Sequence, residues 1–359
     1  MKLGLLINDL RNGGAERLVA DLAVELNERE GIDPAVLVVN RNGEFVSTLE
    51  TSGIPVRSLD VEVSTPTIPR GVRALSKLLA TGDIELVHSH LSYSHVVGRL
   101  ACARQSIPHV STYHNVCDHK TPLKRAAERT TRPLSDRIVC VSEGVRQSYT
   151  TTDDMVVIYN GIDHRAFRER VTAADTSGLL PAGSTDTTVF LNVARCVEQK
   201  RQTDLVDAVA ELDATDLHLF IVGDGPRRAS LEERVSDKGL SDQITVAGYV
   251  DRIEPYYAVA DAFVSSSSRE GLPSTHLEAK AAGLPIISTE IPGVRELVEH
   301  ETDGYLCRVG KPSEIAAYMR TIHDTDPYEL GKRGFEAVTA EFSLTTIATD
   351  HAELYRNLI

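Results

Sequence analysis

The chain has 359 residues, 42% of them apolar, and a formal net charge of −14 at pH 7. This length exceeds the roughly 250 to 300 residues at which a single hydrophobic core stops growing, so we expect two globular domains and exclude whole-chain disorder or a fibrous repeat. The acidic excess disfavours general nucleic-acid binding, because phosphate neutralisation needs a basic surface, and we expect no nucleic-acid partner.

Short β-rich runs alternate with longer helical patterns along the whole chain. The strand-like runs form two series, residues 3–7, 35–39, 86–88, 138–141 and 156–158, then 189–193, 217–222, 244–246, 262–265 and 285–288. This alternation is typical of parallel sheets with helices on both faces. We therefore predict an α/β protein of two doubly wound, Rossmann-like domains that face each other across a cleft and hold a two-part ligand at their strand ends.

Between the two series lies Thr172–Thr187, which has neither helical nor strand periodicity. Its richness in Ala, Asp, Thr, Ser and Gly is typical of a linker or a loop. We interpret it as the inter-domain connection or as a surface loop beside that connection.

A glycine pair follows the first predicted strand. Gly13 and Gly14 precede apolar residues spaced along one helical face, so the local pattern is strand, glycine turn, helix. Such a turn lets a ligand approach the backbone, and the free N–H groups of a helix start favour an anion. The Gly-x-Gly-x-x-Gly pattern of a nicotinamide fold is absent. A helix start that needs glycine only for its turn remains the alternative.

Histidines end two strand-like runs. His88 and His90 close one run, and His114 follows another at residues 110–113. An imidazole at the expected cleft edge can donate a hydrogen bond to a sugar hydroxyl or a phosphate oxygen. Metal binding by His88 and His90 competes with this interpretation, without a clear third ligand nearby in sequence. An ordinary loop or core histidine is the other alternative for His114.

Two cations stand where the first strand of the second series ends. Arg195 and Lys200 lie five residues apart and lead into a predicted helix. Arg offers a planar fork to phosphate oxygens and Lys a point charge, so together they can neutralise a leaving diphosphate without a metal. A solvated basic surface is the alternative.

Two carboxylates follow the strand-like run 262–265. Glu270 lies in the loop and Glu278 one turn inside the next predicted helix. The glycine and proline between them shape a tight turn that would expose the N–H groups of Ser274 and Thr275 to an anion. Glu278 would then reach ribose hydroxyls and Glu270 a sugar. Thr275 and Glu278 also form a T-x-x-E capping box, which would need no ligand.

The order of these features resembles glycosyltransferase family 4, the retaining sugar transferases of GT-B fold. The glycine pair, Arg195 with Lys200, and the E-x7-E of Glu270 and Glu278 stand at the strand ends where the family has them. Further matching segments are residues 158–163, 223–226, 283–285 and 304–306. The resemblance covers nearly the whole chain. It implies an acceptor-side domain at 1–165, a nucleotide-sugar domain at 166–341 and a closing helix at 342–359 that returns to the first domain.

The resemblance also implies a role for each site residue. Arg195 and Lys200 would bind the donor diphosphate, Glu278 the ribose and Glu270 the donor sugar, while His114 would approach the sugar from the first domain. The implied catalytic residues are His114, Arg195, Lys200 and Glu270, and the implied donor-binding residues are Gly13, Gly14, Gly223, Tyr249, Val250, Gly271, Leu272, Pro273, Ser274 and Glu278.

In such enzymes a sugar passes from a nucleoside diphosphate to an acceptor by front-face attack. The resemblance therefore implies a UDP- or GDP-linked donor, a glycan or lipid-linked acceptor, and no cofactor or divalent metal. The one Asp-x-Asp, Asp324–Asp326, is interpreted as a helix connection. Leu272-Pro273 replaces the family's commoner Phe-Gly and His276 a frequent apolar residue, which leaves the donor sugar open. The alternatives are a nucleotide-sugar epimerase or hydrolase of the same fold and a non-catalytic nucleotide-sugar-binding protein.

One basic segment contrasts with the acidic chain. Residues Asp118–Arg137 carry six cations and three acids, a net charge of +3. Arg125, Arg129 and Arg132 would share one helical face. We hypothesise that Lys120–Arg137 rests on an anionic membrane surface to present the acceptor. A solvated helix is the alternative.

The five cysteines are scattered and never form C-x-x-C, so neither a disulfide framework nor a zinc ribbon is expected. The opening apolar run stops at Ile7, too short for a signal peptide, and no run approaches 18 apolar residues. We expect a cytoplasmic protein, with peripheral contact to the inner face of the cell membrane.

Overall fold

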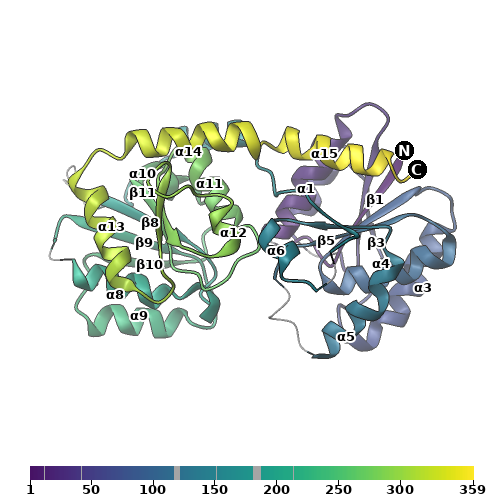
Figure 1. Cartoon of the computed structure of the whole chain (residues 1–359), viewed down its shortest axis with the longest axis horizontal. Coiled ribbons are helices and arrows are strands. Elements are labelled where there is room, and N and C mark those ends of the chain that lie inside the picture. Colours follow the sequence, from purple (N-terminus) through teal and green to yellow (C-terminus); the bar gives the residue numbers. More distant parts are fainter. Residues whose placement is uncertain (12, 42, 117–121, 151, 181–186, 213) are drawn as a thin grey trace. The chain divides into compact units, whose positions relative to one another are not determined.

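A computed structural model describes the chain except for residues 12, 42, 117–121, 151, 181–186 and 213. For residues 122–125 it describes the backbone but not the side chains. The chain divides into two compact units (Figure 1). Unit 1 comprises Met1–Gly161 and Leu344–Ile359, and unit 2 comprises Ile162–Ser343. Thr172–Thr187 falls inside the span of unit 2, so its interpretation as the inter-domain connection is wrong.

The sheet of unit 1 has seven parallel strands in the order β3-β2-β1-β4-β5-β6-β7. Its strands are β1 (Lys2–Ile7), β2 (Asp33–Val38), β3 (Val56–Ser58), β4 (Leu86–His90), β5 (His109–Tyr113), β6 (Arg137–Cys140) and β7 (Met155–Val157). Its helices are α1 (Gly14–Asn27), α2 (Phe45–Thr51), η1 (Thr65–Thr67), α3 (Ile68–Leu79), α4 (Ser92–Gln105), α5 (Pro122–Thr131), η3 (Arg132–Leu134), α6 (Glu143–Gln147) and α15 (Leu344–Arg356). The strand order reverses between β1 and β4, which makes the carboxyl ends of these strands the expected ligand edge.

The sheet of unit 2 has six parallel strands in the order β10-β9-β8-β11-β12-β13. Its strands are β8 (Thr188–Val193), β9 (Leu217–Val222), β10 (Ile244–Gly248), β11 (Ala262–Ser265), β12 (Ile286–Thr289) and β13 (Gly304–Cys307). Its helices are α7 (His164–Thr172), η4 (Glu198–Lys200), α8 (Gln202–Glu211), α9 (Arg228–Asp237), α10 (Glu254–Val259), α11 (Ser274–Ala282), α12 (Pro292–Arg295), α13 (Pro312–Asp324) and α14 (Tyr328–Glu341). Here the order reverses between β8 and β11. The prediction of two doubly wound α/β domains is confirmed.

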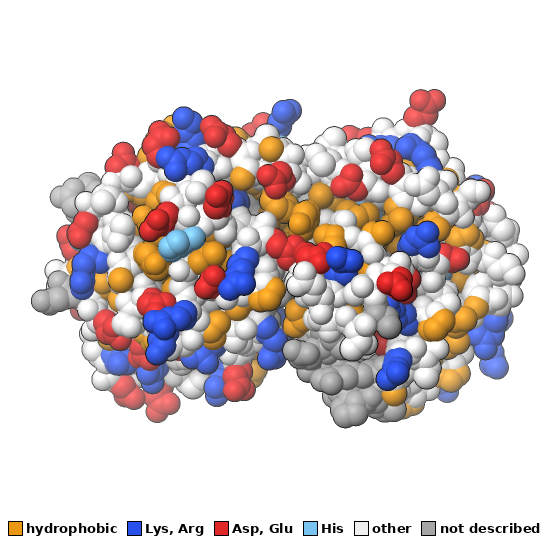
Figure 2. Space-filling view, in the orientation of Figure 1, with side chains coloured by type: hydrophobic (Ala, Val, Ile, Leu, Met, Phe, Trp, Pro, Cys, Tyr) orange, Lys and Arg blue, Asp and Glu red, His pale blue; other side chains and the backbone are white. Residues whose placement is uncertain are grey.

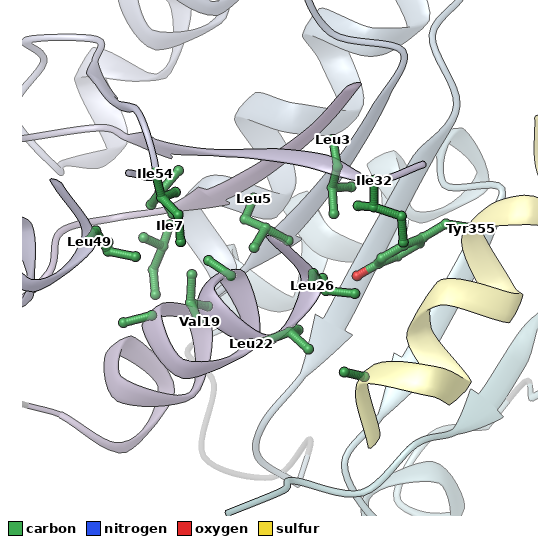
Figure 3. Packing of buried hydrophobic residues seen from close by; sticks show 14 of the residues in the cluster. Leu3, Leu5, Ile7, Val19, Leu22, Leu26, Ile32, Leu49, Ile54 and Tyr355 are labelled. Carbon is green, nitrogen blue, oxygen red and sulfur yellow. The ribbon is translucent and has the colours of Figure 1, made fainter. Parts of the chain in front are cut away.

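The core of unit 1 lies on both faces of its sheet. The central strand β1 contributes side chains to both faces. Leu5 of β1 and Leu22 of α1 are fully buried, and the apolar residues of α1 recur at helical spacing on one face (Figure 3). Tyr355 of α15 enters the same cluster and is also fully buried. The last helix is therefore part of the core of unit 1.

Several features of the sequence that lie outside the site can be compared with the structure. Asp324 ends α13 and Tyr328 begins α14, which confirms Asp324–Asp326 as a helix connection. Four cysteines carry free, buried thiols, and Cys117 lies outside the described residues. Within the described part of the chain, no helix combines the length and apolar character needed to cross a bilayer. Acidic and basic side chains are interspersed over the face shown in Figure 2.

Candidate active site

The loops that leave β8 and β11 are joined at the carboxyl edge of the unit 2 sheet. The Ser266 hydroxyl donates to the carbonyls of Lys200 and Arg201, both at 2.9 Å. The Ser268 N–H donates to the carbonyl of Gln199 at 2.8 Å. These bonds hold two loops, each carrying candidate catalytic residues, at the point where the strand order reverses. The serines were not predicted, although the run of four serines that begins at the last residue of β11 could have indicated them.

Lys200 and Glu270 form an ion pair between the two loops. The Lys200 Nζ lies 2.6 Å from the Glu270 Oε1, and their side chains are 18% and 9% exposed. A charge-assisted bond in this partly dry position is stronger than one at the surface. The two residues, predicted separately from motifs 70 residues apart, thus form one charged cluster.

Arg195 lies at the end of β8 with its side chain exposed. Its carbonyl accepts a bond from the Gln202 carboxamide at 3.1 Å, and its guanidinium has no hydrogen bond or ion pair to any described residue. The next loop packs tightly beneath it, because a Cβ at Gly223 would lie 2.1 Å from the carbonyl oxygen of Ala194. Gly223 also has φ +135, a conformation that favours glycine. The guanidinium is therefore available to an anion at a well-supported loop.

The loop between the two predicted carboxylates leads directly into α11. The helix begins at Ser274 with the buried Pro273 at its N-cap, so Thr275 lies inside the first turn and the capping-box alternative is wrong. Gly271 and Leu272 are buried. The backbone of this loop is thus fixed, with the helix N-terminus of Ser274 at the edge of the sheet.

Glu278 is held by a residue that the sequence analysis did not identify. The Tyr257 hydroxyl of α10 donates to the Glu278 Oε2 at 2.9 Å, and Glu278 is 8% exposed. Nothing local in sequence indicated this partner, because it comes from a different helix. The bond orients the carboxylate that is predicted to bind ribose.

The loops after β9 and β10 form the remaining part of this edge. The Gly223 N–H donates to the carbonyl of Gly248 at 2.8 Å. Tyr249 is 52% exposed and Val250 is half-buried. Arg228, which was not predicted, packs its guanidinium where a Cβ on Gly248 would stand, and it pairs with Glu232 at 2.8 Å. A second arginine therefore lies at this edge.

His276 is buried beneath the loop that leads from β11 into α11, rather than exposed to a ligand. Its Nε2 lies 2.9 Å from the Ser288 hydroxyl, and it is 1% exposed. Burial lowers the pKa of His276 to about 3. The imidazole is therefore neutral and belongs to the packing of α11 on the sheet.

In unit 1, the half-buried His114 stands next to two buried imidazoles, His88 and His90, at the ends of β4 and β5. The Nε2 of His114 lies 3.0 Å from the Nδ1 of His90, and burial lowers the pKa of His114 to about 4. His88 contacts the hydroxyls of Thr112 and Tyr355, each at 2.6 Å, and is fully buried. His88 is therefore a core residue. Among the described residues no group of three or more His, Cys, Asp or Glu could hold a metal ion.

Gly13 and Gly14 begin α1 as predicted. Gly13 is the N-cap and Gly14 the first helical residue. A Cβ on Gly13 would lie 2.3 Å from the Oε2 of Glu16, so the Glu16 carboxylate already lies at this helix start. An anionic ligand here would have to displace that carboxylate.

The structure brings one group of predicted residues together and leaves another in a separate unit. Arg195, Lys200, Glu270, Glu278 and the loop before α11 share the carboxyl edge of the unit 2 sheet. The other group, His114 with Gly13 and Gly14, belongs to unit 1. The unit 2 edge offers cations, a helix N-terminus and carboxylates, which suits a ligand with both phosphate and hydroxyl groups.

Comparison with known proteins gives two family matches. The family model described as Glycosyltransferase Family 4 matches residues 12–166, and the model described as Glycosyl transferases group 1 matches residues 182–333. Together they cover most of both units.

Among curated relatives, N-acetyl-alpha-D-glucosaminyl L-malate synthase of Bacillus anthracis is 26% identical over 57% of this chain and 54% of its own length. With this protein, as with two further relatives, the chain spans about half of the relative's length. An Escherichia coli protein named UDP-Gal:alpha-D-GlcNAc-diphosphoundecaprenol alpha-1,3-galactosyltransferase is 27% identical over 80% of this chain and 79% of its own. The crystal structure of Anabaena HepE in complex with UDP-glucose matches with a TM-score of 0.85 and 22% identity, over 99% of this chain and 100% of that chain. That last likeness is one of fold.

Proposed function

We propose a function from one premise, that the chain belongs to glycosyltransferase family 4 and has the GT-B fold. We infer that it transfers a sugar from a nucleoside-diphosphate sugar to a glycan or lipid-linked acceptor and retains the configuration at the anomeric carbon. The observation that carries the proposal is the pairing of Lys200 with Glu270 at 2.6 Å, at the same edge of the sheet as the available guanidinium of Arg195.

The proposed reaction needs positive charge where the donor breaks. The bond between the anomeric carbon and the diphosphate oxygen breaks, and its electron pair stays on the diphosphate. The acceptor hydroxyl oxygen bonds to the same face of that carbon, and its proton passes to the departing phosphate oxygen. Arg195 and Lys200 bind the diphosphate and stabilise its growing charge, as preorganised cations do in other active sites.

The remaining residues position the donor. Glu270 accepts hydrogen bonds from the donor sugar, and Glu278, oriented by Tyr257, accepts them from the ribose. The half-exposed Tyr249 and its neighbour Val250 lie beside the base. His114 is neutral, since burial lowers its pKa to about 4, and so contributes a hydrogen bond rather than a charge. We propose that no cofactor or divalent metal is needed, because Arg195 and Lys200 supply the charge.

The names of similar proteins support a choice of substrates. One fold neighbour binds UDP-glucose, and the name of the Escherichia coli relative specifies UDP-Gal and a diphosphoundecaprenol-linked acceptor. We propose a UDP-linked hexose as donor, with GDP-linked hexoses as the second choice. A lipid-linked acceptor would bring the enzyme to the inner face of the cell membrane.

The test is a donor panel in the presence of a chelator. Purified protein is incubated with UDP-glucose, UDP-galactose and GDP-mannose, and thermal shift and nucleotide release are followed for the wild type and for Glu270→Ala. We expect one donor to stabilise the protein and release nucleotide slowly, and Glu270→Ala to abolish the release. Rapid release of nucleotide without any acceptor would favour a hydrolase, and conversion of the donor into another nucleotide sugar would favour an epimerase. Tight binding without release, with or without acceptors, would favour a non-catalytic binding protein.

A further inference from the structure

A groove of about 620 Å³ runs along unit 1 between α3 and α4, away from the candidate site. The two helices touch near Gly71, where an added Cβ would lie 3.1 Å from both the Tyr93 hydroxyl and a methyl of Val97. Apolar side chains from both helices, including Ile68, Val72 and Leu100, line the groove. The helices thus leave apolar surface open that they do not bury against each other.

Every charged residue that lines the groove is a cation. Arg73, Lys77 and Arg104 are exposed, and none pairs with an acidic side chain in the described part of the chain. In the described structure, the one hydrogen bond that these side chains make runs from Arg104 to the carbonyl of Leu100, at 2.7 Å. In a chain with a net charge of −14, a groove that carries three unpaired cations and no acid is a local reversal of charge.

One of the lining residues also carries a buried polar atom. The hydroxyl oxygen of Ser76, a lining residue, is buried and has no hydrogen-bond partner among the described residues. The lining thus matches an amphiphile with an anionic end.

We propose that this groove docks on the anionic phospholipids of a membrane surface, with lipid phosphates on Arg73, Lys77 and Arg104 and apolar lipid groups against Ile68, Val72 and Leu100. An acyl chain needs no hydrogen-bond partners, and the groove offers few, which favours lipid over an extended acidic peptide. The inference goes beyond the proposed catalytic function and does not depend on it.

The neighbouring helix α5 carries part of the basic segment that was predicted to rest on a membrane. α4 contacts both α3 and α5, so these helices form one layer on the sheet (Figure 1). In the basic segment, Arg129 is exposed, but Arg132 is bonded to Asp154. Lys120 and the side chains of Lys124 and Arg125 lie outside the described residues. The proposal therefore rests on the described cations of the groove, and the basic segment is tested separately by Arg129→Glu.

The test is co-sedimentation of the full chain at low salt with vesicles of phosphatidylcholine alone or mixed with phosphatidylglycerol. The key variant is the double charge reversal Arg73→Glu/Lys77→Glu. Arg165→Glu/Arg320→Glu is the matched control, because it changes the net charge equally at exposed helical arginines of unit 2. We expect wild type and control to bind only the anionic vesicles and the groove variant to bind at least about 30-fold more weakly, at about 1 kcal/mol for each cation.

Two further variants keep the proposal falsifiable. Leu100→Asn keeps all three cations and should reduce the binding that persists at high salt, where charge attraction is screened. Arg129→Glu tests α5 and should change binding less than the groove variant does. Absence of wild-type binding to anionic vesicles, or full binding by Arg73→Glu/Lys77→Glu with thermal stability intact, would overturn the proposal. Binding of an acidic amphipathic peptide but not of vesicles would assign the groove to a protein partner and overturn it as well.

Discussion

At the scale of single residues, the charged cluster of unit 2 separates into a structural pair and an available cation. Lys200 neutralises a carboxylate that is only 9% exposed, so its loss would leave Glu270 poorly solvated and without that partner. The Arg195 side chain is exposed and bonds to no described residue, so within the described structure only the backbone of Arg195 contributes hydrogen bonds. The two cations should therefore respond differently to substitution.

We predict that Arg195→Ala lowers kcat/KM for the donor by about 10²–10³-fold without changing the melting temperature. Lys200→Ala should lower activity to a similar degree and also lower the melting temperature. Steady-state kinetics and thermal unfolding check both, with Lys238→Ala as control, since this lysine pairs with Asp207 on the distant face of α8 and α9. Wild-type activity in Arg195→Ala would remove this residue from the site.

A second prediction at this scale concerns Tyr257. Tyr257→Phe removes the hydroxyl that lies 2.9 Å from Glu278 but keeps the ring, which packs edge-on against Phe167 and stacks over Phe263. A hydrogen bond to a charged group contributes about 1.5–3 kcal/mol, so donor KM should rise by roughly tenfold or more. kcat should fall less, because the hydroxyl acts through Glu278. The neighbouring Tyr256→Phe is the control, and an unchanged KM in Tyr257→Phe would refute its positioning role.

Sequence reasoning selected the candidate site residues that lie in recognisable local patterns. Arg195, Lys200, Glu270 and Glu278 follow strands that the β-rich runs made visible. It could not identify Tyr257, because its partner Glu278 is 21 residues away on another helix. Contacts of this kind depend on how helices pack, which periodicity does not reveal.

At the scale of elements, α12 supports the loop between β11 and α11 by close backbone contact. A Cβ on Gly293 of α12 would lie 1.9 Å from the carbonyl oxygen of Gly271. Gly293→Ala must therefore shift α12 or the loop, and we predict a loss of donor binding together with lower stability. Gly334→Ala is the control, because its Cβ would meet its nearest atom at an ordinary 3.4 Å in α14. Donor titration by thermal shift measures the effect, and normal binding in Gly293→Ala would contradict it.

The packing of helices on buried histidines makes stability depend on pH. Burial lowers the pKa of His351 on α15 and of His276 on α11 to about 3, from 6.5, and lowers those of His88 and His90 as well. Below pH 6.5 the unfolded chain therefore binds more protons than the folded chain. Stability present above that pH is lost as pH falls, by up to about 1.4 kcal/mol per pH unit for each such histidine.

We predict that the free energy of unfolding in urea falls steadily from about pH 7 to about pH 5, before the carboxylates titrate. His351→Gln should reduce this slope, because it removes one of the protonating groups. A flat profile over this range would contradict the prediction.

The elements that the sequence missed are short and lie near sheet edges. β3 (Val56–Ser58) has three residues and forms one edge, and β13 (Gly304–Cys307) forms the edge of the other sheet. Central strands are long apolar runs because they are buried on both faces, whereas an edge strand of three or four residues has little pattern. The central strands were therefore predicted and these edges were not.

At the scale of the whole molecule, the chain contributes to unit 1 twice. Residues 344–359 belong with the first 161, and Tyr355 contacts His88 across 267 positions of sequence. The family resemblance indicated such a returning helix, but no local pattern specified that it ends in the core of unit 1. Both sheets reverse their strand order at the edge where candidate residues gather, which is how doubly wound domains build ligand sites.

We propose that this molecule moves a sugar from a nucleoside diphosphate with retention of configuration and without a metal. The most direct measurement is the reaction of the accepted donor, carrying an α-linked hexose, with a lipid-linked or glycan acceptor in excess chelator, followed by NMR of the product's anomeric proton. We expect an α-linked product that forms as fast with chelator as without it. A β-linked product, or a reaction that stops when divalent ions are removed, would contradict it.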